Sequence, residues 1–568
     1  MGGVFEGLTA APAKGGLTVR AWIVLMLLAV AALAPGLFSI PAMDRDESRY
    51  AQASRQMMES GDYINIRLQD VDRHKQPAAT YWLQALAAQP FGGADAPIGA
   101  HRLPGFLFAL FAVAATAWLG ARMFSPAAGL TAGLILATTL VLAVEARTAK
   151  TDAILLGVGM IAQVALMILM IEVKARRPAF IGWPAVMWAA LGATLLIKGP
   201  IFFMVTALTL IVFAVWKRDA GLLLKVRPLP GVLLALAIFA PWFIAINLET
   251  DWDFARTAIG YSMLDKVGEA QEAHSGPLGF HLVATLFTLW PGIALLPLGL
   301  LAAWKMRGED RVKFLIAWIL PTYVVFELVA TKLPHYTLPS YPAVAILIAL
   351  GLVQAGELLA SGRVKIVHGV FAVIAIAVAL LLGAVPVGGS IYLGETPDLA
   401  AWLSIGFGVL AAGAIAALAL KPSGGRLLGM SVAAAALYTC VFGVAIPNVD
   451  RLWPSERASR IVDQITGCEV LTLATSGYEE PSNMVNLGTD VALTDTPEEA
   501  AGVLLSDPRC GLAIVDSRGL ADFGASIEAA GGELRLLATL EGHNAVKGDD
   551  LSLGFYTLEG SNLPLAPR

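Results

Sequence analysis

Two adjacent carboxylates follow the first long apolar run of the chain. The run covers residues 21–40, and Asp46 and Glu47 come shortly after it, flanked by Arg45 and Arg49. A carboxylate at the rim of a membrane helix bundle can act as a general base. A structural alternative has Asp46 as the N-cap of a short helix and Glu47 in its first turn, where the helix dipole favours negative charge. The residues alone leave both interpretations open.

A second acidic candidate, Asp152, ends a turn that begins at Glu145. This turn lies between two later apolar runs, and the predicted topology of the chain places it on the same membrane face as Asp46. The two carboxylates can therefore line one cavity. Thr151 and Asp152 also suit the N-cap of the following helix, which is the structural alternative.

Further polar side chains stand at the outer ends of other apolar runs. They are Lys75, Lys198, Lys266, Lys332, His335 and Tyr336. Each lysine alone is typical of an interfacial anchor, whose stem lies along apolar surface. Together, lysines with a tyrosine and a histidine supply the charge-assisted hydrogen bonds that a phosphate group needs. The pattern predicts a phosphate site at this membrane face.

The composition indicates what kind of protein must position these residues. Of 568 residues 57% are hydrophobic and 15% are charged, and the mean hydropathy is +0.70. These values are typical of a polytopic membrane protein. The net charge of -5 and the lack of a basic tail or recognition motif exclude a nucleic-acid-binding function.

Thirteen membrane spans are predicted, because a bilayer core of roughly 30 Å needs about 20 apolar residues per helix. They cover approximately residues 21–41, 101–121, 127–145, 153–171, 180–197, 200–216, 230–248, 281–303, 313–331, 336–356, 366–387, 400–420 and 427–446. A signal peptide is rejected for residues 1–40, since the apolar run is long and no small-residue cleavage site follows it. With a retained first helix and a cytoplasmic N-terminus, the cytoplasmic loops carry clustered Lys and Arg residues, which is the positive-inside pattern.

Two long loops, 42–100 and 249–280, fall on the opposite, periplasmic face. The first loop breaks the cation rule, since it holds Arg45, Arg49, Arg55, Arg67, Arg73 and Lys75. Such cations indicate a binding role, although long loops also translocate regardless of their charge. Residues 48–60 have the spacing of a short amphipathic helix lying at the interface, and a second helix is expected after Pro77.

From Asp450 onward, short helices and strands alternate, which predicts a small sheet flanked by helices. We therefore divide the chain into a membrane domain, 1–447, and a periplasmic α/β domain, 448–568. Cys468 and Cys510 each precede a predicted strand. If those strands are parallel neighbours, the thiols start at one sheet edge and can form a disulfide in an oxidising periplasm; two buried thiols are the alternative.

The distribution of charge separates chemistry at a membrane face from transport across the membrane. An ionisable residue within a span is a functional candidate, and Glu327 is the clearest one. A transporter is expected to place carboxylates near the bilayer midplane, whereas the charges here gather at one rim. This distribution favours chemistry on a group anchored in the outer leaflet.

At this point the residues resemble a known family, the polyprenyl-phosphate-sugar-dependent membrane glycosyltransferases related to the lipid A aminoarabinose transferase and, more distantly, to protein O-mannosyltransferases. The order and spacing of D-E-x-R-Y-A and K-x-P-x-x-x-Y-W after the first span are its most specific pieces. The segments that carry the resemblance are Asp46–Ala51, Ser60–Asp62, Lys75–Pro77, Tyr81–Trp82, Thr151–Ala153, Lys198–Gly199, His274–Pro277, Trp290–Pro291 and Lys332–Tyr336.

The resemblance implies roles for individual residues. Asp46 matches the family's catalytic base and Glu47 its partner, and Asp152 matches a second acidic residue that positions the acceptor or a divalent metal. Asp46 and Asp152 are then the candidate metal ligands. The groups expected at the donor phosphate are Lys75, Tyr336, Lys266, His335 and Lys198.

The expected function is transfer of a sugar from a polyprenyl-phosphate carrier to an acceptor at the periplasmic face, with inversion. The expected acceptor is lipid A or another envelope glycolipid. Two alternatives stay open: a protein O-glycosyltransferase, and a flippase or transporter of lipid-linked sugars. Membrane lipids, the donor and the acceptor are the expected partners of a monomer in the bacterial inner membrane. No cofactor is expected with certainty, and a divalent metal is possible.

Overall fold

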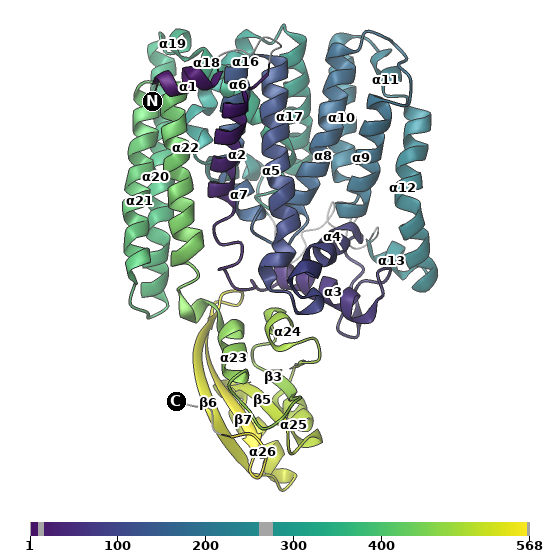
Figure 1. Cartoon of the computed structure of the whole chain (residues 1–568), viewed down its shortest axis with the longest axis vertical. Coiled ribbons are helices and arrows are strands. Elements are labelled where there is room, and N and C mark those ends of the chain that lie inside the picture. Colours follow the sequence, from purple (N-terminus) through teal and green to yellow (C-terminus); the bar gives the residue numbers. More distant parts are fainter. Residues whose placement is uncertain (1, 10–15, 259, 261–275, 565–568) are drawn as a thin grey trace.

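The computed structural model describes residues 2–9, 16–258, 260 and 276–564, and the structural statements that follow refer to these residues. A bundle of long helices forms one part of the molecule, and a smaller α/β domain projects from one end of it (Figure 1). The N-terminus lies at the opposite end of the bundle. The apolar helices described next are those of a polytopic membrane protein.

Six helical segments among the described residues are long and apolar enough to cross a membrane. They are α5 (Ile98–Met123), α8 with its continuation (Asp152–Glu172), α12 (Pro228–Glu249), α20 (Gly362–Tyr392), α21 (Leu399–Leu420) and α22 with its continuation (Gly424–Ala445). Shorter apolar helices pack among them. They are α2 (Val19–Leu33), α6 (Pro126–Thr138), α9 (Trp183–Lys198), α10 (Ile201–Lys217) and η6 with α18 (Leu338–Val353). With α17 (Asp310–Leu328) and the bent pair below, each predicted span overlaps a helix.

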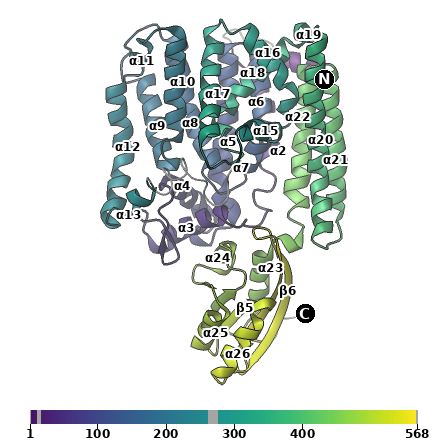
Figure 2. The same cartoon turned by 180° about the vertical axis from the view of Figure 1, so that it is seen from behind.

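One predicted span is sharply broken. Residues 281–303 form α15 (Phe280–Thr288) and a second segment, Gly292–Lys305, that ends in α16 (Leu296–Lys305), and the two are bent by 111°. Figure 2 shows α15 next to α17, and Thr285 Oγ1 lies 2.8 Å from the Tyr323 hydroxyl of α17. The apolar run predicted a continuous helix, which is wrong at this break.

Close helix packing fixes the turn that precedes α18 (Tyr341–Val353). α16 and α18 approach each other so closely that a Cβ on Gly351 would lie 2.3 Å from the Gly299 nitrogen. Small residues permit such contact between membrane helices, which associate mainly by van der Waals packing. Tyr341 and the next eleven residues of α18 are all buried. The residues just before α18 are therefore anchored to the bundle core.

The first long loop forms a layer at the end of the bundle nearest the α/β domain (Figure 1). It contains α3 (Asp46–Ser60), a two-stranded hairpin of β1 (Arg67–Leu68) and β2 (Val71–Asp72), and α4 (Ala79–Ala88). The helix predicted at 48–60 and the helix after Pro77 are confirmed. Gly61, in the left-handed conformation with φ 72°, ends α3.

The α/β domain contains a five-stranded sheet in the order β4-β3-β5-β7-β6. Its strands are β3 (Thr472–Ser476), β4 (Ala492–Thr494), β5 (Gly511–Asp516), β6 (Leu534–Asn544) and β7 (Asp549–Leu558), and its helices include α23 (Pro454–Val462), α24 (Ser482–Leu487), α25 (Pro497–Ser506) and α26 (Leu520–Ala529). Strands β3 and β5 are parallel neighbours. Cys468 and Cys510, which precede them, form a disulfide with their Cα atoms 5.9 Å apart.

Candidate functional site

Asp46 lies at the start of α3, at the end of the bundle that faces the α/β domain. Its side chain is 64% exposed, and its Oδ1 atom lies 3.8 Å from Arg49 Nη1 and 3.9 Å from Arg73 Nη2. These separations are longer than hydrogen bonds, so the two cations stabilise the carboxylate without occupying its lone pairs. The N-cap alternative for Asp46 is wrong, because Arg45 occupies that position and Asp46 is the first helical residue.

Glu47, the next residue, is held in a buried ion pair. Arg102 donates from Nε and Nη2 to its two oxygens at 2.8 and 2.7 Å. The backbone N–H groups of Met43 and Ala149 donate to the same carboxylate at 3.0 and 2.7 Å. Four donors leave little capacity for accepting a substrate proton. The catalytic assignment of Glu47 is therefore corrected: this residue ties the start of α3 to α5 and to the turn before α8.

A second polar cluster surrounds Asp152, the first residue of α8. Both of its oxygens accept from Lys198 Nζ, at 2.7 and 2.8 Å. His335 lies between two carboxylates, with Nε2 3.7 Å from Asp152 and Nδ1 3.5 Å from Glu145. Lys150 Nζ lies 3.3 Å from Glu145. The start of α8 and the turn before it, the end of α9 and the turn before α18 thus bring these five residues together.

Tyr336 joins the same cluster from the turn before α18. Its ring centroid lies 6.0 Å from Lys198 Nζ and 6.4 Å from the His281 ring, to which it is nearly parallel. The ring also packs against Phe326, at 5.4 Å. Three of the residues predicted at the donor phosphate, Lys198, His335 and Tyr336, are therefore neighbours.

A buried tyrosine connects the Asp46 and Asp152 regions. Tyr50 of α3 stacks on Tyr81 of α4 with ring centroids 5.1 Å apart, and Arg73 lies 5.1 Å above the Tyr50 ring. Burial raises the pKa of Tyr50 well above its usual value, Tyr81 raises it further, and Arg73 partly offsets the rise. Asp46 and Asp152 also raise it. Both carboxylates therefore act electrostatically on one phenol.

Within the Asp152 cluster, the pKa of His335 is lowered and the pKa of Lys150 is raised. Burial lowers the pKa of His335, and the carboxylates of Asp152 and Glu145 only partly offset this, so the imidazole is neutral near pH 7. Burial also disfavours the charged form of Lys150, but Glu145, Asp152 and Asp46 together raise its pKa. The cluster thus presents ammonium groups beside a neutral imidazole, which can donate or accept a hydrogen bond.

The other two predicted phosphate contacts are Lys75, in the first long loop, and Lys266, in the second. Lys75 is exposed in the segment between β2 and α4. Beside it, His74 is buried and its ring nitrogens lie 2.8 Å from Asp253 Oδ2 and 3.1 Å from Asn65 Oδ1, which joins the first long loop to the second. Lys266 falls outside the described residues.

Glu327 and Lys332 have structural roles in the described part of the chain. The backbone N–H groups of Gly279 and His281 donate to the Glu327 carboxylate at 2.9 and 2.8 Å, which satisfies the start of α15. Lys332 Nζ donates to the carbonyl oxygens of Glu327 and Val329 at the end of α17. The interpretation of Lys332 as part of a phosphate site is therefore corrected.

The candidate metal ligands do not form a metal site. Within the described residues, no group of three His, Cys, Asp or Glu side chains is arranged to hold a metal ion. Lys198 occupies both oxygens of Asp152, so a divalent ion there would have to displace an ammonium group. A divalent ion such as Mg²⁺ needs several free oxygen ligands. The donor set around Asp152 does not fit such an ion.

Sequence reasoning missed Arg102, Glu145 and Lys150 as parts of these clusters. Arg102 is completely buried within α5. A charged residue within an apolar span indicates a buried partner, and this was the signal that could have identified Arg102. Glu145 and Lys150 belong to the same turn as Asp152, and charged residues closely spaced at the end of a span were the available signal. Their partners lie far away in sequence, so their pairing had no local signature.

Sequence comparison relates the chain to lipid-linked sugar transferases. Residues 75–244 match the family described as dolichyl-phosphate-mannose-protein mannosyltransferase. The chain is 27% identical over 339 residues to undecaprenyl phosphate-alpha-4-amino-4-deoxy-L-arabinose arabinosyl transferase 1 of Pseudomonas fluorescens, covering 59% of this chain and 60% of that protein. It is 28% identical over 342 residues to the corresponding transferase of Erwinia tasmaniensis, covering 59% and 61%. The chain thus matches about 60% of the length of these relatives.

Comparison with solved structures finds the same fold over nearly the whole chain. ArnT from Cupriavidus metallidurans bound to undecaprenyl phosphate matches with a TM-score of 0.73 at 18% identity, over 94% of this chain and 98% of that one. Its apo structure matches with a TM-score of 0.74 at 20% identity, with the same coverage. At these identities the match establishes the fold. Together with the sequence relatives it confirms the resemblance to the aminoarabinose transferase-like family that the motifs indicated.

Proposed function

We propose that this chain is an inner-membrane glycosyltransferase that moves a sugar from a polyprenyl-phosphate carrier to an envelope glycolipid, such as lipid A, with inversion at the anomeric carbon. A pentose fits the sequence relatives, which are named for an aminoarabinose. The observation that carries the proposal is the presence, at one end of the bundle, of an exposed carboxylate, Asp46, and of two ammonium groups, Lys198 and Lys150, each paired with a buried carboxylate. These are the two kinds of group that such a transfer requires.

In the proposed reaction Asp46 is the general base. An acceptor oxygen attacks the anomeric carbon, its proton passes to the Asp46 carboxylate, and the bond from that carbon to the phosphate oxygen breaks. The electron pair leaves with the phosphate, so negative charge grows on the carrier. A positioned base contributes about 10²–10⁴-fold to such a step. Asp46 suits this role because it is exposed and its cationic neighbours lie beyond hydrogen-bond distance.

The donor phosphate is proposed to bind on the side of Lys198, His335 and Tyr336. Ammonium groups and a hydroxyl can stabilise the charge that develops on the leaving phosphate. Asp152 holds Lys198 in place rather than taking a proton. Lys75, and Lys266 in the second loop, are proposed as further phosphate contacts by the family resemblance.

The proposed site also fixes an orientation. The carrier's apolar chain must lie in lipid while its phosphate reaches water, so a site at the rim of the helices suits it. We propose that all thirteen apolar segments cross the membrane, with the N-terminus cytoplasmic. The first long loop and the 448–568 domain then lie in the periplasm, where the disulfide between Cys468 and Cys510 is stable. We propose a monomer.

The test is transfer in membranes that contain the protein and purified polyprenyl-phosphate sugar. Asp46→Asn should abolish the transfer of sugar to lipid A, measured by mass spectrometry of the extracted lipid. Asp70→Asn is the matched control, because Asp70 is an exposed aspartate of the same loop, in the turn between β1 and β2. Transfer that survives in Asp46→Asn would overturn the assignment of Asp46 as the base.

A protein acceptor is the second candidate, and the match of residues 75–244 to a protein mannosyltransferase family favours it. Lipid A from a strain that lacks the gene should lose one sugar relative to the parent strain if the acceptor is lipid A. An unchanged lipid A spectrum, together with the loss of a hexose from Ser or Thr of an envelope protein, would replace the glycolipid with a protein.

A further inference from the structure

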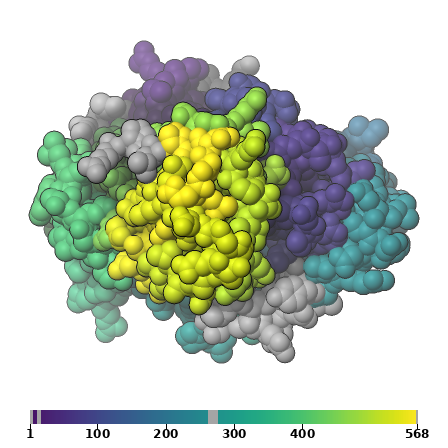
Figure 3. All heavy atoms as spheres, turned by 90° about the horizontal axis from the view of Figure 1, so that it is seen from below, coloured from purple at the N-terminus to yellow at the C-terminus, as the bar shows by residue number. Residues whose placement is uncertain are grey.

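The α/β domain contacts the loop that carries Asp46. Seen from the end of the molecule, the domain lies over the bundle with the first long loop beside it (Figure 3). The Tyr478 hydroxyl donates to Asp44 Oδ2 at 3.2 Å, and Arg45 Nε lies 3.7 Å from Glu480 Oε2. These contacts reach the two residues immediately before Asp46. The Tyr478–Pro481 turn, which has no role in the proposed chemistry, thus supports the start of α3.

A second set of contacts holds the outer face of α3. Gln52 donates to Thr489 Oγ1 at 2.7 Å, and that hydroxyl donates to Glu59. Arg55 donates to the carbonyl oxygen of Val485 at 3.2 Å. The inner face of α3 packs on apolar residues of the bundle and of α4, among them Tyr81. The helix is thus clamped between the bundle and the α/β domain.

The backbone just before Asp46 needs such support. Arg45 has φ 65° and ψ -121°, a positive-φ conformation that a residue with a side chain rarely adopts. Conformations of this kind persist where the surroundings hold them and occur often at functional sites. The contacts of Arg45 with Glu480 and of Asp44 with Tyr478 lie on both sides of this peptide. Both contacts therefore act on the backbone that leads directly into Asp46.

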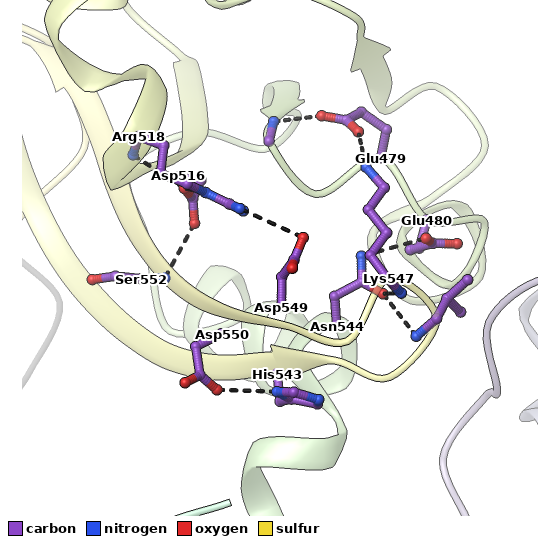
Figure 4. Close-up of polar contacts among 12 residues, drawn as sticks. Glu479, Glu480, Asp516, Arg518, His543, Asn544, Lys547, Asp549, Asp550 and Ser552 are labelled. Atoms are coloured by element: carbon purple, nitrogen blue, oxygen red, sulfur yellow. Dashed lines mark hydrogen bonds and ion pairs between the residues drawn. The ribbon is translucent and has the colours of Figure 1, made fainter.

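Glu480 is well placed for this role and its neighbour is not. The Glu480 side chain is 6% exposed, and Asn544 Nδ2 donates to its Oε1 at 3.4 Å, which leaves Oε2 facing Arg45. Glu479 instead reaches Lys547 of its own domain, at 3.4 Å (Figure 4). Two adjacent glutamates of one turn therefore face different ways, one toward the site and one within the domain.

We infer that Tyr478 and Glu480 of the α/β domain are positioning residues for the transfer reaction, acting through Asp44 and Arg45 to set the orientation of Asp46. This inference rests on the proposed function. It assigns the C-terminal domain a part in catalysis without contact with the sugar. A base must be held close to its working geometry, since a displacement of about 1 Å can cost about 100-fold in rate.

The test compares Glu480→Gln with Glu479→Gln in the full chain, in membranes with purified donor and acceptor. Glu480→Gln and Tyr478→Phe should each lower kcat by about tenfold with KM for the donor little changed, because misorientation of the base affects the reaction and not donor binding. Glu479→Gln should keep the wild-type kcat. The charge exchange Arg45→Glu with Glu480→Arg should recover part of the lost activity.

Hydrogen exchange of residues 44–50 gives a readout independent of activity. It should rise in Glu480→Gln and stay unchanged in Glu479→Gln, with the unfolding temperature of both variants equal to that of the wild type. The inference is overturned if the two variants match in kcat and exchange, or if both lose thermal stability together. If the wild type transfers no sugar, the proposed function fails, and the exchange data still decide whether the domain orders this loop.

Discussion

Asp46 and Asp152 both raise the pKa of Tyr50, yet the protein holds the two carboxylates in opposite ways. Asp46 is 64% exposed, and its nearest cations are 3.8 and 3.9 Å away. Asp152 is 11% exposed and bonds to Lys198 at 2.7 Å. A loosely paired, exposed carboxylate can exchange protons with a substrate, whereas a buried carboxylate bonded to an ammonium group serves to fix that group. The same residue type thus suits a base at one place and a scaffold at the other.

The largest expected effect is on turnover when Asp46 is changed. Asp46→Asn should lower kcat by about 10²–10⁴-fold, the usual contribution of a general base. The free energy of unfolding of the Asp46→Asn variant should differ from that of the wild type by less than about 0.5 kcal/mol, as for most surface substitutions. Transfer kinetics and thermal unfolding in detergent measure the two quantities. A kcat within tenfold of wild type would remove the contrast between Asp46 and Asp152.

The next effect is on stability, and it comes from the neighbour of Asp46. Glu47→Gln leaves Arg102, which is completely buried, without its counter-charge. Breaking a buried ion pair costs about 3–5 kcal/mol. Glu456→Gln is the matched control, because Glu456 pairs with Arg460 in an exposed i,i+4 arrangement, where such pairs contribute about 0.3–0.5 kcal/mol. Equal unfolding temperatures for the two variants would contradict a structural role for Glu47.

Asp152 should behave like Glu47 and unlike Asp46. Asp152→Asn is expected to destabilise the protein by about 3 kcal/mol, since Lys198 stays charged in a site where its side chain is 14% exposed. Replacing both partners, as in Asp152→Asn with Lys198→Met, should recover most of that stability, because apolar replacement of a buried pair is often neutral. Unfolding in detergent measures both variants. A double variant as unstable as the single one would show that Asp152 does more than hold Lys198.

The sequence predicted the elements of this site better than its pairings. The helix at 48–60 follows from its amphipathic spacing and from Gly61, and the edge shared by Cys468 and Cys510 follows from their positions before strands. The pairing of Glu47 with Arg102 joins residues 55 positions apart, and periodicity has no information about such contacts. The sharp bend before Gly292 and the three-residue strand β4 were not predicted, because an apolar run contains no signal for a bend and three residues are too few to show an alternating pattern.

The smallest effect concerns the contact between the α/β domain and the Asp46 loop, and it depends on pH. Burial raises the pKa of Asp44 from 3.8 to about 6, with hydrogen bonds from Ser482 and Tyr478 opposing the rise and Glu480 adding to it. Below about pH 4 the carboxyl is protonated whether or not the domain is in contact. Between about pH 4 and pH 6 only the separated state ionises, so the contact weakens as the pH rises. Because Asp44 is partly exposed, we discount this loss to roughly 2 kcal/mol.

Asp44→Asn should remove this pH dependence, because asparagine keeps an acceptor for the Tyr478 hydroxyl but does not ionise. Hydrogen exchange of residues 44–50 at pH 5 and pH 7 is the measurement: the wild type should exchange faster at pH 7 after correction for intrinsic rates, and Asp44→Asn should not. Asp70→Asn, in the same loop, should follow the wild type. A wild-type contact that strengthens between pH 5 and pH 7 would mean that Asp44 is ionised in the docked state, paired more closely with Arg45 than with Tyr478. The negative charge of Asp44 would then stabilise the contact between the α/β domain and the Asp46 loop, whereas we expect that charge to weaken it.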